Sequence, residues 1–222
     1  MDLGDRMKNY ENTLRQYLTP RMPVIMRIDG KAFHSLTRKC KKPFDVDFAS
    51  AMDCTARKLL NEIQNSRMAY VQSDEISILL IDYNTFQSQQ WFGGNIQKMV
   101  SVSASISGVE FSQIFGKNGY FDSRVFILPK NDIVNYFIWR QQDCTRNSVS
   151  SVAQSLYSPK QLHQKSNSKM QDMIFDKGIN WNNYESYWKR GRIILKDNAN
   201  LDIPIFSQDR KYIEKFMEIE EE

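Results

Sequence analysis

Apolar runs of strand length recur four times in the first 130 residues of the chain. The first is expected over 24–28, and the second and third over 67–72 and 75–83, with only Ser73 and Asp74 between them. So short a connection between two apolar runs is typical of a tight hairpin. A fourth strand is expected over 121–129, where Pro129 ends it.

Helical spacing of apolar residues fills the intervals between these strands. One helix is expected after Pro43, with Asp45 or Asp47 near its N-cap, and a second helix over 95–114. The order β-α-β-β-α-β that results is that of ferredoxin-like folds. The apolar face of the first helix comprises Phe48, Ala49, Met52, Ala56, Leu59, Leu60 and Ile63, and that of the second comprises Met99, Val102, Ile106 and Val109.

The pattern becomes mainly helical from Asn131 onward. We therefore predict an α+β chain with two parts: a ferredoxin-like domain with an N-terminal helix over 1–130, and an α-rich appendage over 131–222 packed on its sheet. The elements expected in the appendage are helical segments over 131–144 and 148–157, helix starts at Ser158-Pro159 and at a capping box of Ser168 and Gln171, a helix end at Gly178, and a short strand over 193–196.

Composition and charge narrow the possible partners. Of the 222 residues, 41% are hydrophobic and 25% are charged, which is ordinary for a globular protein with a buried core. The net charge is +4, but the final residues "EIEEE" carry four of the 26 acidic side chains. Without those four glutamates, 30 basic side chains face 22 acidic ones, so the body of the chain has a balance of +8. This excess favours a polyanionic partner such as nucleic acid.

The cysteines and the apolar stretches bear on where the protein resides. Cys40, Cys54 and Cys144 are odd in number and form no C-x-x-C pair, so we expect free thiols rather than disulfides or a zinc site. The N-terminal stretch is charged and lacks the apolar core of a signal peptide, and no apolar stretch approaches the ~18 residues of a membrane span. The sequence therefore predicts a soluble, cytoplasmic protein that makes no use of a membrane.

Acidic residues stand at the ends of two expected strands. Asp29 closes the first strand and precedes Gly30, whereas Asp74 and Glu75 lie at the hairpin tip. The first and third strands of a β-α-β-β-α-β sheet are neighbours, so these carboxylates are expected to meet at one edge. Clustered carboxylates repel one another unless a cation joins them, and Mg²⁺ prefers one or two carboxylates together with substrate phosphates. Two such ions ~3.5–4 Å apart can activate a hydroxyl and hold phosphates.

Backbone amides beside this edge offer a second part of a phosphate site. Gly30 allows a ligand to approach closely, and the amides from Lys31 to His34 could hold a triphosphate. Two simpler interpretations stay open: an Asp-Gly turn at Asp29, and a solvated hairpin tip at Ser73. A histidine-based nucleophilic triad is disfavoured because the chain contains only two histidines.

Five segments taken together indicate a family. "RIDGKAFHSLTRKCKKPFD", "YVQSDEISILL", "GGNIQKMVSVSAS", "FDSRVFILP" and "YFIWRQQDCTRNS" resemble, in order and spacing, the tRNA-histidine guanylyltransferase superfamily from about Val24 to Leu195. Its members add a guanylate to the 5′ end of histidine tRNA or act as 3′–5′ polymerase-like enzymes. The resemblance implies a polymerase-type palm that holds two Mg²⁺ ions, takes GTP and ATP as substrates, binds tRNA and forms a homotetramer.

The same resemblance implies roles for individual residues. Asp29, the carbonyl of Gly30 and Asp74 would be the metal ligands, and Glu75 would join the two aspartates as a catalytic residue. The implied nucleotide-binding residues are Asp29, Gly30, Lys31, Ala32, Phe33, His34, Lys42, Asp45, Ser73, Asp74, Lys98 and Asn147. The residues expected to contact tRNA are Arg146, Lys169, Lys189, Arg190 and Arg192.

One segment departs from the superfamily pattern. Members dedicated to histidine tRNA carry a His-Ile-Asn-Asn tetrad where this chain has Thr145, Arg146, Asn147 and Ser148. In this respect the chain resembles the members that repair tRNA. We therefore expect template-dependent 3′–5′ addition of nucleotides to the 5′ end of truncated tRNA, after ATP or GTP activates its 5′ phosphate.

Three alternatives stay open. Within the superfamily, the alternative is guanylate addition to histidine tRNA. A ferredoxin-like sheet can also be a non-catalytic RNA-binding module, but such modules expose aromatic side chains on the central strands. Here the first strand has no aromatic residue, and the third has none before Tyr83. A nucleotide cyclase with the same palm would leave the basic, α-rich remainder unexplained.

Overall fold

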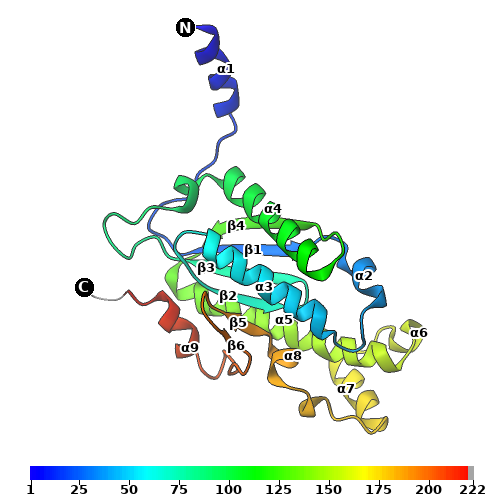
Figure 1. Ribbon diagram of the computed structural model, residues 1–222. Coiled ribbons are helices and arrows are strands. Elements are labelled where there is room, and N and C mark those ends of the chain that lie inside the picture. The colour runs from blue at the N-terminus through cyan, green and yellow to red at the C-terminus, as the bar shows by residue number, and fades with distance from the viewer. Residues whose placement is uncertain (220–222) are drawn as a thin grey trace.

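One antiparallel sheet of six strands runs through the molecule (Figure 1). The computed structural model describes residues 1–219, so positions 220–222 of the acidic tail lie outside the described residues. The strands stand in the order β4-β1-β3-β2-β5-β6, and the first four have the arrangement of a ferredoxin-like fold, which confirms the predicted α+β class. Their bounds are β1 Val24–Gly30, β2 Ser66–Gln72, β3 Glu75–Leu80, β4 Phe121–Ile127, β5 Arg192–Ile194 and β6 Ala199–Asn200.

Two helices, α3 (Val46–Glu62) and α4 (Ile96–Phe115), cover one face of the sheet (Figure 1). The Asp45 carboxylate caps α3 by accepting a hydrogen bond from the Phe48 amide at 2.9 Å. Helix α3 then buries an apolar stripe, including Leu59, in the core that lies between this helix layer and β1. This face of the sheet therefore consists of apolar packing, as the helical periodicity predicted.

Helix α4 approaches β4 through small side chains. Its buried residues stand four positions apart, and the Ser103 hydroxyl donates a hydrogen bond to the Ser123 hydroxyl of β4 at 2.8 Å. The predicted apolar face is wrong at Val109, which is 56% exposed. The serines let the helix approach the sheet along a stripe that lies on the other side of the helix from Val109. That stripe consists of Met99, Ser103, Ser107 and Phe111.

Helix α5 (Lys130–Leu156) covers the opposite face as one continuous element, where the sequence predicted two helical segments. Its first half contributes Phe137 to a second apolar core, in which the Phe137 and Tyr70 rings lie 6.3 Å apart. Its second half packs with α7 (Asn167–Asp176) in a third, smaller cluster that contains Val152 and Ile174. One helix therefore joins the sheet to the C-terminal helices.

The C-terminal segment returns to the sheet, because β5 pairs with β2 and β6 pairs with β5. The sheet thus draws strands from both parts of the chain, and the predicted division at residue 130 stays a prediction. The short helices are α2 Phe33–Leu36, α6 Pro159–Leu162, α8 Ser186–Arg190 and α9 Lys211–Glu214, with 3₁₀ turns at Thr37–Lys39, Trp91–Gly94, Trp181–Asn183 and Lys215–Met217.

The ends of the C-terminal helices test the local predictions. Ser158 is the N-cap of α6 and Pro159 its first residue, as the sequence predicted, and Ser158 also forms a capping box that was not predicted. The capping box predicted at Ser168 is wrong, because Ser166 caps α7 by accepting a hydrogen bond at 3.2 Å from the amide three residues later. Gly178 follows the end of α7 with φ 78°, a conformation that glycine adopts without a Cβ clash.

The N-terminal helix α1 (Leu3–Asn12) projects from the rest of the molecule (Figure 1). It contains no buried residue, and its apolar side chains Leu3, Met7 and Tyr10 are exposed. An isolated helix of this length is marginal in water, so α1 lacks the tertiary packing that stabilises the longer helices.

The cysteines occupy three different environments. All three are free thiols: Cys54 is exposed, Cys40 is partly buried and Cys144 is buried. Burial raises the pKa of the Cys144 thiol to about 12. Free thiols agree with the sequence prediction.

No helix within residues 1–219 combines the length and the apolar character needed to cross a bilayer.

Candidate functional site

The ends of β1 and β3 bring three carboxylates together. Asp29 pairs directly with Glu75 across the two strands, and the Gly30 amide donates a hydrogen bond to the Asp74 carbonyl at 3.0 Å. Antiparallel pairing produces this arrangement, because the strand that ends after Asp29 lies beside the strand that starts at Glu75. The convergence expected from the sequence is therefore present, and Asp29, Asp74 and Glu75 are termed the carboxylate edge.

Asp74 has an unusual ionisation equilibrium. Burial, together with the nearby carboxylates of Asp29 and Glu75, raises the pKa of its carboxyl to about 6. The hairpin holds Asp74 in this place through Ser73, whose φ of 47° lies in the left-handed region. A cation bound between Asp29 and Asp74 would remove the repulsion that raises this pKa.

The oxygen donors at this edge fit a hard divalent cation. They are the carboxylates of Asp29 and Asp74 and the carbonyl of Gly30, which are the ligand types that Mg²⁺ prefers. Within residues 1–219, there is no group of three or more His, Cys, Asp or Glu side chains able to hold a metal ion. A cation at this edge therefore depends on two carboxylates, a backbone carbonyl and oxygens that the substrate brings.

Glu75 is held differently from its neighbour Asp74. Its two oxygens accept hydrogen bonds from Nε and Nη2 of Arg140, each at 2.8 Å, and Arg27 Nη2 lies 2.9 Å from Glu75 Oε2. Glu75 and Arg140 are 5% and 3% exposed, so this ion pair is buried. Arg27 also reaches Asp29 Oδ2 at 3.1 Å. Glu75 therefore positions Arg27 beside Asp29, and its own oxygens are engaged with two arginines.

The turn after β1 depends on Gly30. A Cβ at this position would lie 2.6 Å from the Phe33 ring, so a larger residue would displace that ring. Phe33 is buried in the apolar core, and Ala32 adopts φ 55° to continue the turn. These two residues can offer a nucleotide only backbone polar groups, whereas the exposed Lys31 and His34 can also offer side chains.

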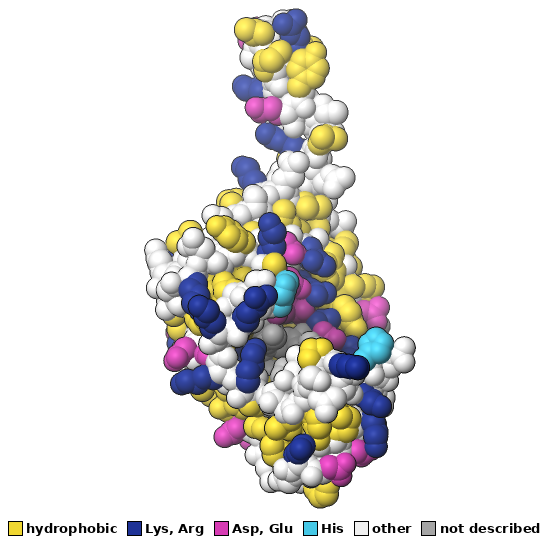
Figure 2. All heavy atoms as spheres, turned by 90° about the vertical axis from the view of Figure 1, so that its right-hand side faces the viewer, with side chains coloured by type: hydrophobic (Ala, Val, Ile, Leu, Met, Phe, Trp, Pro, Cys, Tyr) yellow, Lys and Arg dark blue, Asp and Glu magenta, His cyan; other side chains and the backbone are white. Residues whose placement is uncertain are grey.

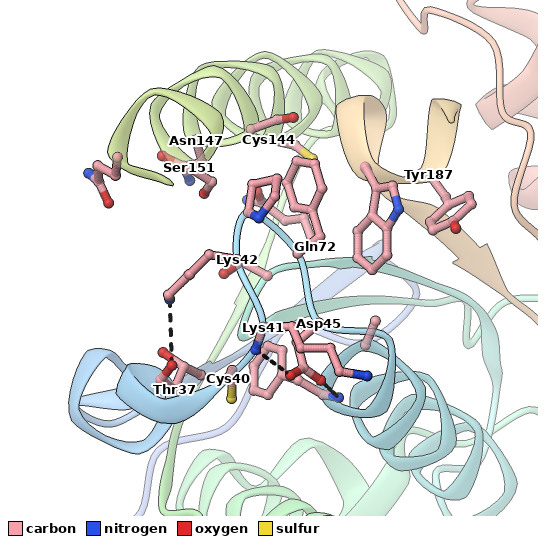
Figure 3. Close-up of a pocket in the computed structure, with 18 of the residues that line it drawn as sticks. Thr37, Cys40, Lys41, Lys42, Asp45, Gln72, Cys144, Asn147, Ser151 and Tyr187 are labelled. Atoms are coloured by element: carbon pink, nitrogen blue, oxygen red, sulfur yellow. Dashed lines mark hydrogen bonds between the residues drawn. The ribbon is translucent and has the colours of Figure 1, made fainter. Parts of the chain in front are cut away.

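A cavity of about 370 Å³ (Figure 3) is lined by Ser73, the residue that precedes Asp74 of the carboxylate edge. Its walls come from the loop between α2 and α3, the end of β2, helix α5 and helix α8. Phe44 and Trp188 form an aromatic part of the wall, with ring centroids 4.8 Å apart and planes 5° from parallel. Five residues predicted to bind nucleotide line this cavity: His34, Lys42, Asp45, Ser73 and Asn147.

Positive charge surrounds this hollow (Figure 2). Lys41 and Lys42 line the cavity, and Lys42 Nζ lies 3.5 Å from the Thr37 carbonyl. Asp45 shapes this loop, because its carboxylate accepts the Lys41 amide at 2.8 Å in addition to the Phe48 amide. Burial opposes ionisation of Asp45, but these backbone hydrogen bonds outweigh it and lower its pKa. The loop thus presents two lysines that can neutralise phosphates.

Lys98 lies away from both the cavity and the carboxylate edge. It occupies the first turn of α4, whereas the other end of α4 leads into β4, which pairs with Gly30. At 1.5 Å per residue, the helix separates Lys98 from that end by about 25 Å. Within one chain, Lys98 is therefore not part of the nucleotide site expected from the sequence.

The residues predicted to contact tRNA differ in their availability. Arg192 is 3% exposed and its Nε lies 2.6 Å from Asp53 Oδ1, so the expectation of a surface contact is wrong there. Lys189 and Arg190 donate hydrogen bonds to backbone carbonyls at 2.6 and 3.3 Å, and burial lowers the pKa of Lys189. The Lys169 side chain is 57% exposed and lies 3.8 Å from an acidic neighbour on the same helix.

Most side chains of the segment 145–148 on α5 make contacts within the protein. The Thr145 hydroxyl donates a hydrogen bond to a backbone carbonyl of α8 at 3.0 Å, and the Ser148 hydroxyl accepts one from Trp181 Nε1 at 3.1 Å. Arg146 pairs at 2.7 Å with an acidic side chain one turn earlier, although its side chain is 55% exposed. Asn147 faces the cavity (Figure 3). The two hydroxyls therefore fix α5 to its neighbours.

Five residues that shape the site were not predicted from the sequence. One signal was available, because Arg27 stands two positions before Asp29 and a strand places such residues on the same face. Phe44 and Gln72 directly precede the predicted residues Asp45 and Ser73, so their positions in the sequence also offered a signal. Arg140 and Trp188 reach the site from α5 and α8 through tertiary packing, which no local pattern reveals. The five residues are Arg27, Phe44, Gln72, Arg140 and Trp188.

Several known proteins similar to this chain carry the same family description. The profile of the tRNAHis guanylyltransferase (Thg1) family matches residues 4–129. A solved bacterial Thg1-like protein in complex with ATP is 43% identical, with a TM-score of 0.95 over 98% of this chain and 100% of its own. A second, in complex with GTP, is 39% identical, with a TM-score of 0.82 over 98% and 99%. The tRNA(His) guanylyltransferase of Debaryomyces hansenii is 28% identical over 86% of this chain and 79% of its own length.

Proposed function

Because the chain belongs to the tRNAHis guanylyltransferase family, we propose that it is a Mg²⁺-dependent nucleotidyltransferase that adds nucleotides in the 3′–5′ direction to the 5′ end of incomplete tRNA. The relatives from Debaryomyces hansenii and Schizosaccharomyces pombe are tRNA(His) guanylyltransferases, so nucleotidyl transfer is the activity of the family. Beyond this family activity, the proposal specifies that the tRNA grows in the 3′–5′ direction, that truncated 5′ ends are repaired and that Mg²⁺ is required.

The observation that carries this proposal is the position of the carboxylate edge beside a cavity with a basic rim. Asp29 and Asp74 supply oxygen ligands at the edge, Ser73 connects Asp74 to the lining of the cavity, and Lys42 supplies positive charge within that lining. One bacterial relative is in complex with ATP and another with GTP, which supports the same ligands for this chain. When bound, two Mg²⁺ ions would lower the pKa of an attacking hydroxyl and neutralise triphosphate charge.

The residues of the chain bind and orient the reactants in two stages. In the first, the 5′ phosphate of tRNA attacks ATP or GTP and pyrophosphate leaves. In the second, the 3′-hydroxyl of the incoming nucleotide loses its proton and attacks that phosphate, and a nucleoside monophosphate leaves. The backbone from Ala32 to His34 and the ammonium groups of Lys31 and Lys42 hold phosphates in both stages, and Asn147 contributes an amide from α5. The Lys31 amide instead donates a hydrogen bond to the Tyr120 carbonyl at 2.7 Å.

Repair, rather than addition restricted to histidine tRNA, is supported by the segment 145–148. Its two hydroxyl groups bind within the protein, because Thr145 donates to α8 and Ser148 accepts from Trp181, which supports a structural role for them. Selection of the added nucleotide must then come from pairing with the unpaired acceptor strand. The backbone amides after Gly30 are compatible with this role, because such amides hold phosphates without distinguishing guanine from adenine.

A homotetramer is the proposed assembly, on the basis of the family. The exposed apolar side chains of α1 support an assembled state, because this helix has no packing partner within its own chain among residues 1–219. Light scattering should give a smaller mass when Leu3, Met7 and Tyr10 are replaced by serine. An unchanged mass would exclude α1 from the interface.

Nucleotide addition to defined tRNAs tests the function directly. The substrates are 5′-truncated tRNAs with different anticodons and different bases opposite the gap, incubated with Mg²⁺ and each nucleoside triphosphate in turn. We expect the complementary nucleotide to be added in each case, whatever the anticodon. Guanylate added only to histidine tRNA, regardless of the opposing base, would reject repair and support histidine-specific addition.

A further inference from the structure

The side-chain amide of Gln72 is buried at the wall of the cavity without a partner for its oxygen. Gln72 is the last residue of β2, is 2% exposed and lines the cavity. Its Oε1 atom has no hydrogen-bond partner within residues 1–219. A buried amide oxygen without a partner destabilises a folded protein, and native proteins contain few of them.

The residue paired with Gln72 across the sheet offers no hydrogen for this oxygen. Strand pairing places Gln72 directly opposite Glu75, on the face of the sheet covered by α5. Glu75 offers no donor, because it is a carboxylate engaged with Arg27 and Arg140. On the facing side of the cavity, α5 presents Asn147 (Figure 3).

We propose that Gln72 is a further nucleotide-binding residue, whose side-chain amide turns its oxygen toward a nucleotide in this cavity and accepts a hydrogen bond from a sugar hydroxyl or a base amino group. This inference rests on the proposed function. A hydrogen-bond acceptor requires a donor, and an ionised triphosphate has none to offer. The partner of Gln72 is therefore the sugar or the base, not the phosphate chain.

The chemistry of the cavity walls agrees with this orientation. Cationic side chains are concentrated at Lys41 and Lys42, where phosphates would be neutralised. The stacked rings of Phe44 and Trp188 offer an apolar surface to the sugar and base. Gln72 then supplies a fixed hydrogen-bond acceptor that orients the nucleoside with respect to the carboxylate edge.

A residue of this kind gives opposite effects on stability and on binding when it is replaced. Gln72→Met keeps the length of the side chain and removes the buried oxygen, so the melting temperature of the free protein should rise. The affinity for GTP should fall by about 3–10-fold, the range expected for one lost hydrogen bond. If Gln72 contributed only to packing, Gln72→Met would change the melting temperature and leave the affinity for nucleotides unchanged.

Titration calorimetry with nucleotide analogues tests the inference and identifies the donor. The probes are GTP, inosine triphosphate, which lacks the base amino group, and 2′,3′-dideoxy-GTP, which lacks both sugar hydroxyls. For the wild-type protein, one analogue should bind as weakly as GTP binds to Gln72→Met, and the variant should not distinguish that analogue from GTP. Gln113→Met, on the exposed side of α4, is the matched control and should bind all three probes like the wild type.

The possible failures are distinguishable because no tRNA is present. Gln72→Leu repeats the test with a second apolar side chain should Gln72→Met not fold. Wild-type affinity for GTP in either folded variant would overturn the role of Gln72 and leave the proposed function intact. A wild-type protein that binds none of the nucleotides would overturn the inference together with the proposed function.

Discussion

The two faces of the central sheet have different chemistry. The face under α3 and α4 is apolar along β1, where the side chains of Met26 and Ile28 are buried in the core. The face under α5 changes from apolar to charged along the same strand. Ile25 is buried in an apolar core, whereas Arg27 and Asp29 form an ion pair. The apolar face supports folding alone, whereas the other face supports folding at one end and carries charge at the other.

This difference shows how a small sheet tolerates functional charge. The charged end is not a set of isolated ions, since Arg140 and Arg27 pair with Glu75 and Arg27 also reaches Asp29. Burying such a pair contributes little net stability, because desolvation offsets the attraction. We therefore infer that the ion pairs of Glu75 with Arg27 and Arg140 serve to position Asp29.

The largest expected effect comes from removing a carboxylate at the charged end. Asp29→Ala and Asp74→Ala should each reduce nucleotide addition by at least about 10²–10³-fold, by removing an oxygen ligand for the cation and the phosphates. Their folding should remain intact, because loss of one carboxylate relieves repulsion. Single-turnover extension and thermal melting measure the two quantities. Activity within tenfold of wild type in either variant would exclude the metal-site assignment.

Asp122 provides the matched control for these variants. It lies directly opposite Asp29 on β4, but its side chain is 57% exposed and pairs with Arg124. Asp122→Ala should therefore retain nearly full activity. A comparable loss in this variant would mean that general charge at the edge, rather than the position of Asp29, supports the reaction.

The second-largest effect is expected for the buried ion pair between Arg140 and Glu75 on the α5 face. Arg140→Met should lower the free energy of unfolding by about 3–5 kcal/mol, because it leaves Glu75 buried with one of its two arginines. Urea unfolding measures this change. Combining Arg140→Met with Glu75→Met should recover a large part of the loss, because both charges are then absent. A double variant less stable than Arg140→Met alone would contradict the ion-pair explanation.

A substitution on the apolar face should lower the stability of the protein and leave the rate of nucleotide addition unchanged. Leu59→Ala on α3 should lower the free energy of unfolding by about 2–5 kcal/mol through lost burial and a residual cavity. The rate of nucleotide addition by the folded fraction should stay close to wild type at a temperature well below melting. A large fall in this rate would mean that the two faces are coupled more strongly than their composition indicates.

The smallest effect is expected at the exposed basic surface. Lys169→Ala should weaken tRNA binding slightly and reduce the salt dependence by a slope of about one or less, the contribution of one phosphate contact. Lys58→Ala, on the other side of the sheet, is the control. Binding isotherms at several salt concentrations give the slopes. Equal slopes for Lys169→Ala and wild type would remove Lys169 from the tRNA surface.

The sequence predicted what depends on strand order and failed where contacts come from distant segments. The convergence of Asp29 with Asp74 follows from the β-α-β-β-α-β order alone. The burial of Arg192 does not follow, because Asp53 lies 139 residues earlier and only the folded chain brings the two together. Arg140 likewise reaches Glu75 across 65 residues. A basic residue on a short strand has the same local pattern whether it meets solvent or a buried carboxylate.

The three cysteines give the protein a graded reactivity toward alkylating reagents. The exposed Cys54 should react first, Cys40 more slowly, and Cys144 last, because its buried thiol has a pKa of about 12 and forms little thiolate. Cys40 lines the cavity, so an occupied cavity should slow its modification and leave that of Cys54 unchanged. Cys144 also lines the cavity, but it is only 6% exposed, so Cys40 is the faster reporter of an occupied cavity. The natural thiols thus report on the solvent through Cys54 and on the ligand through Cys40.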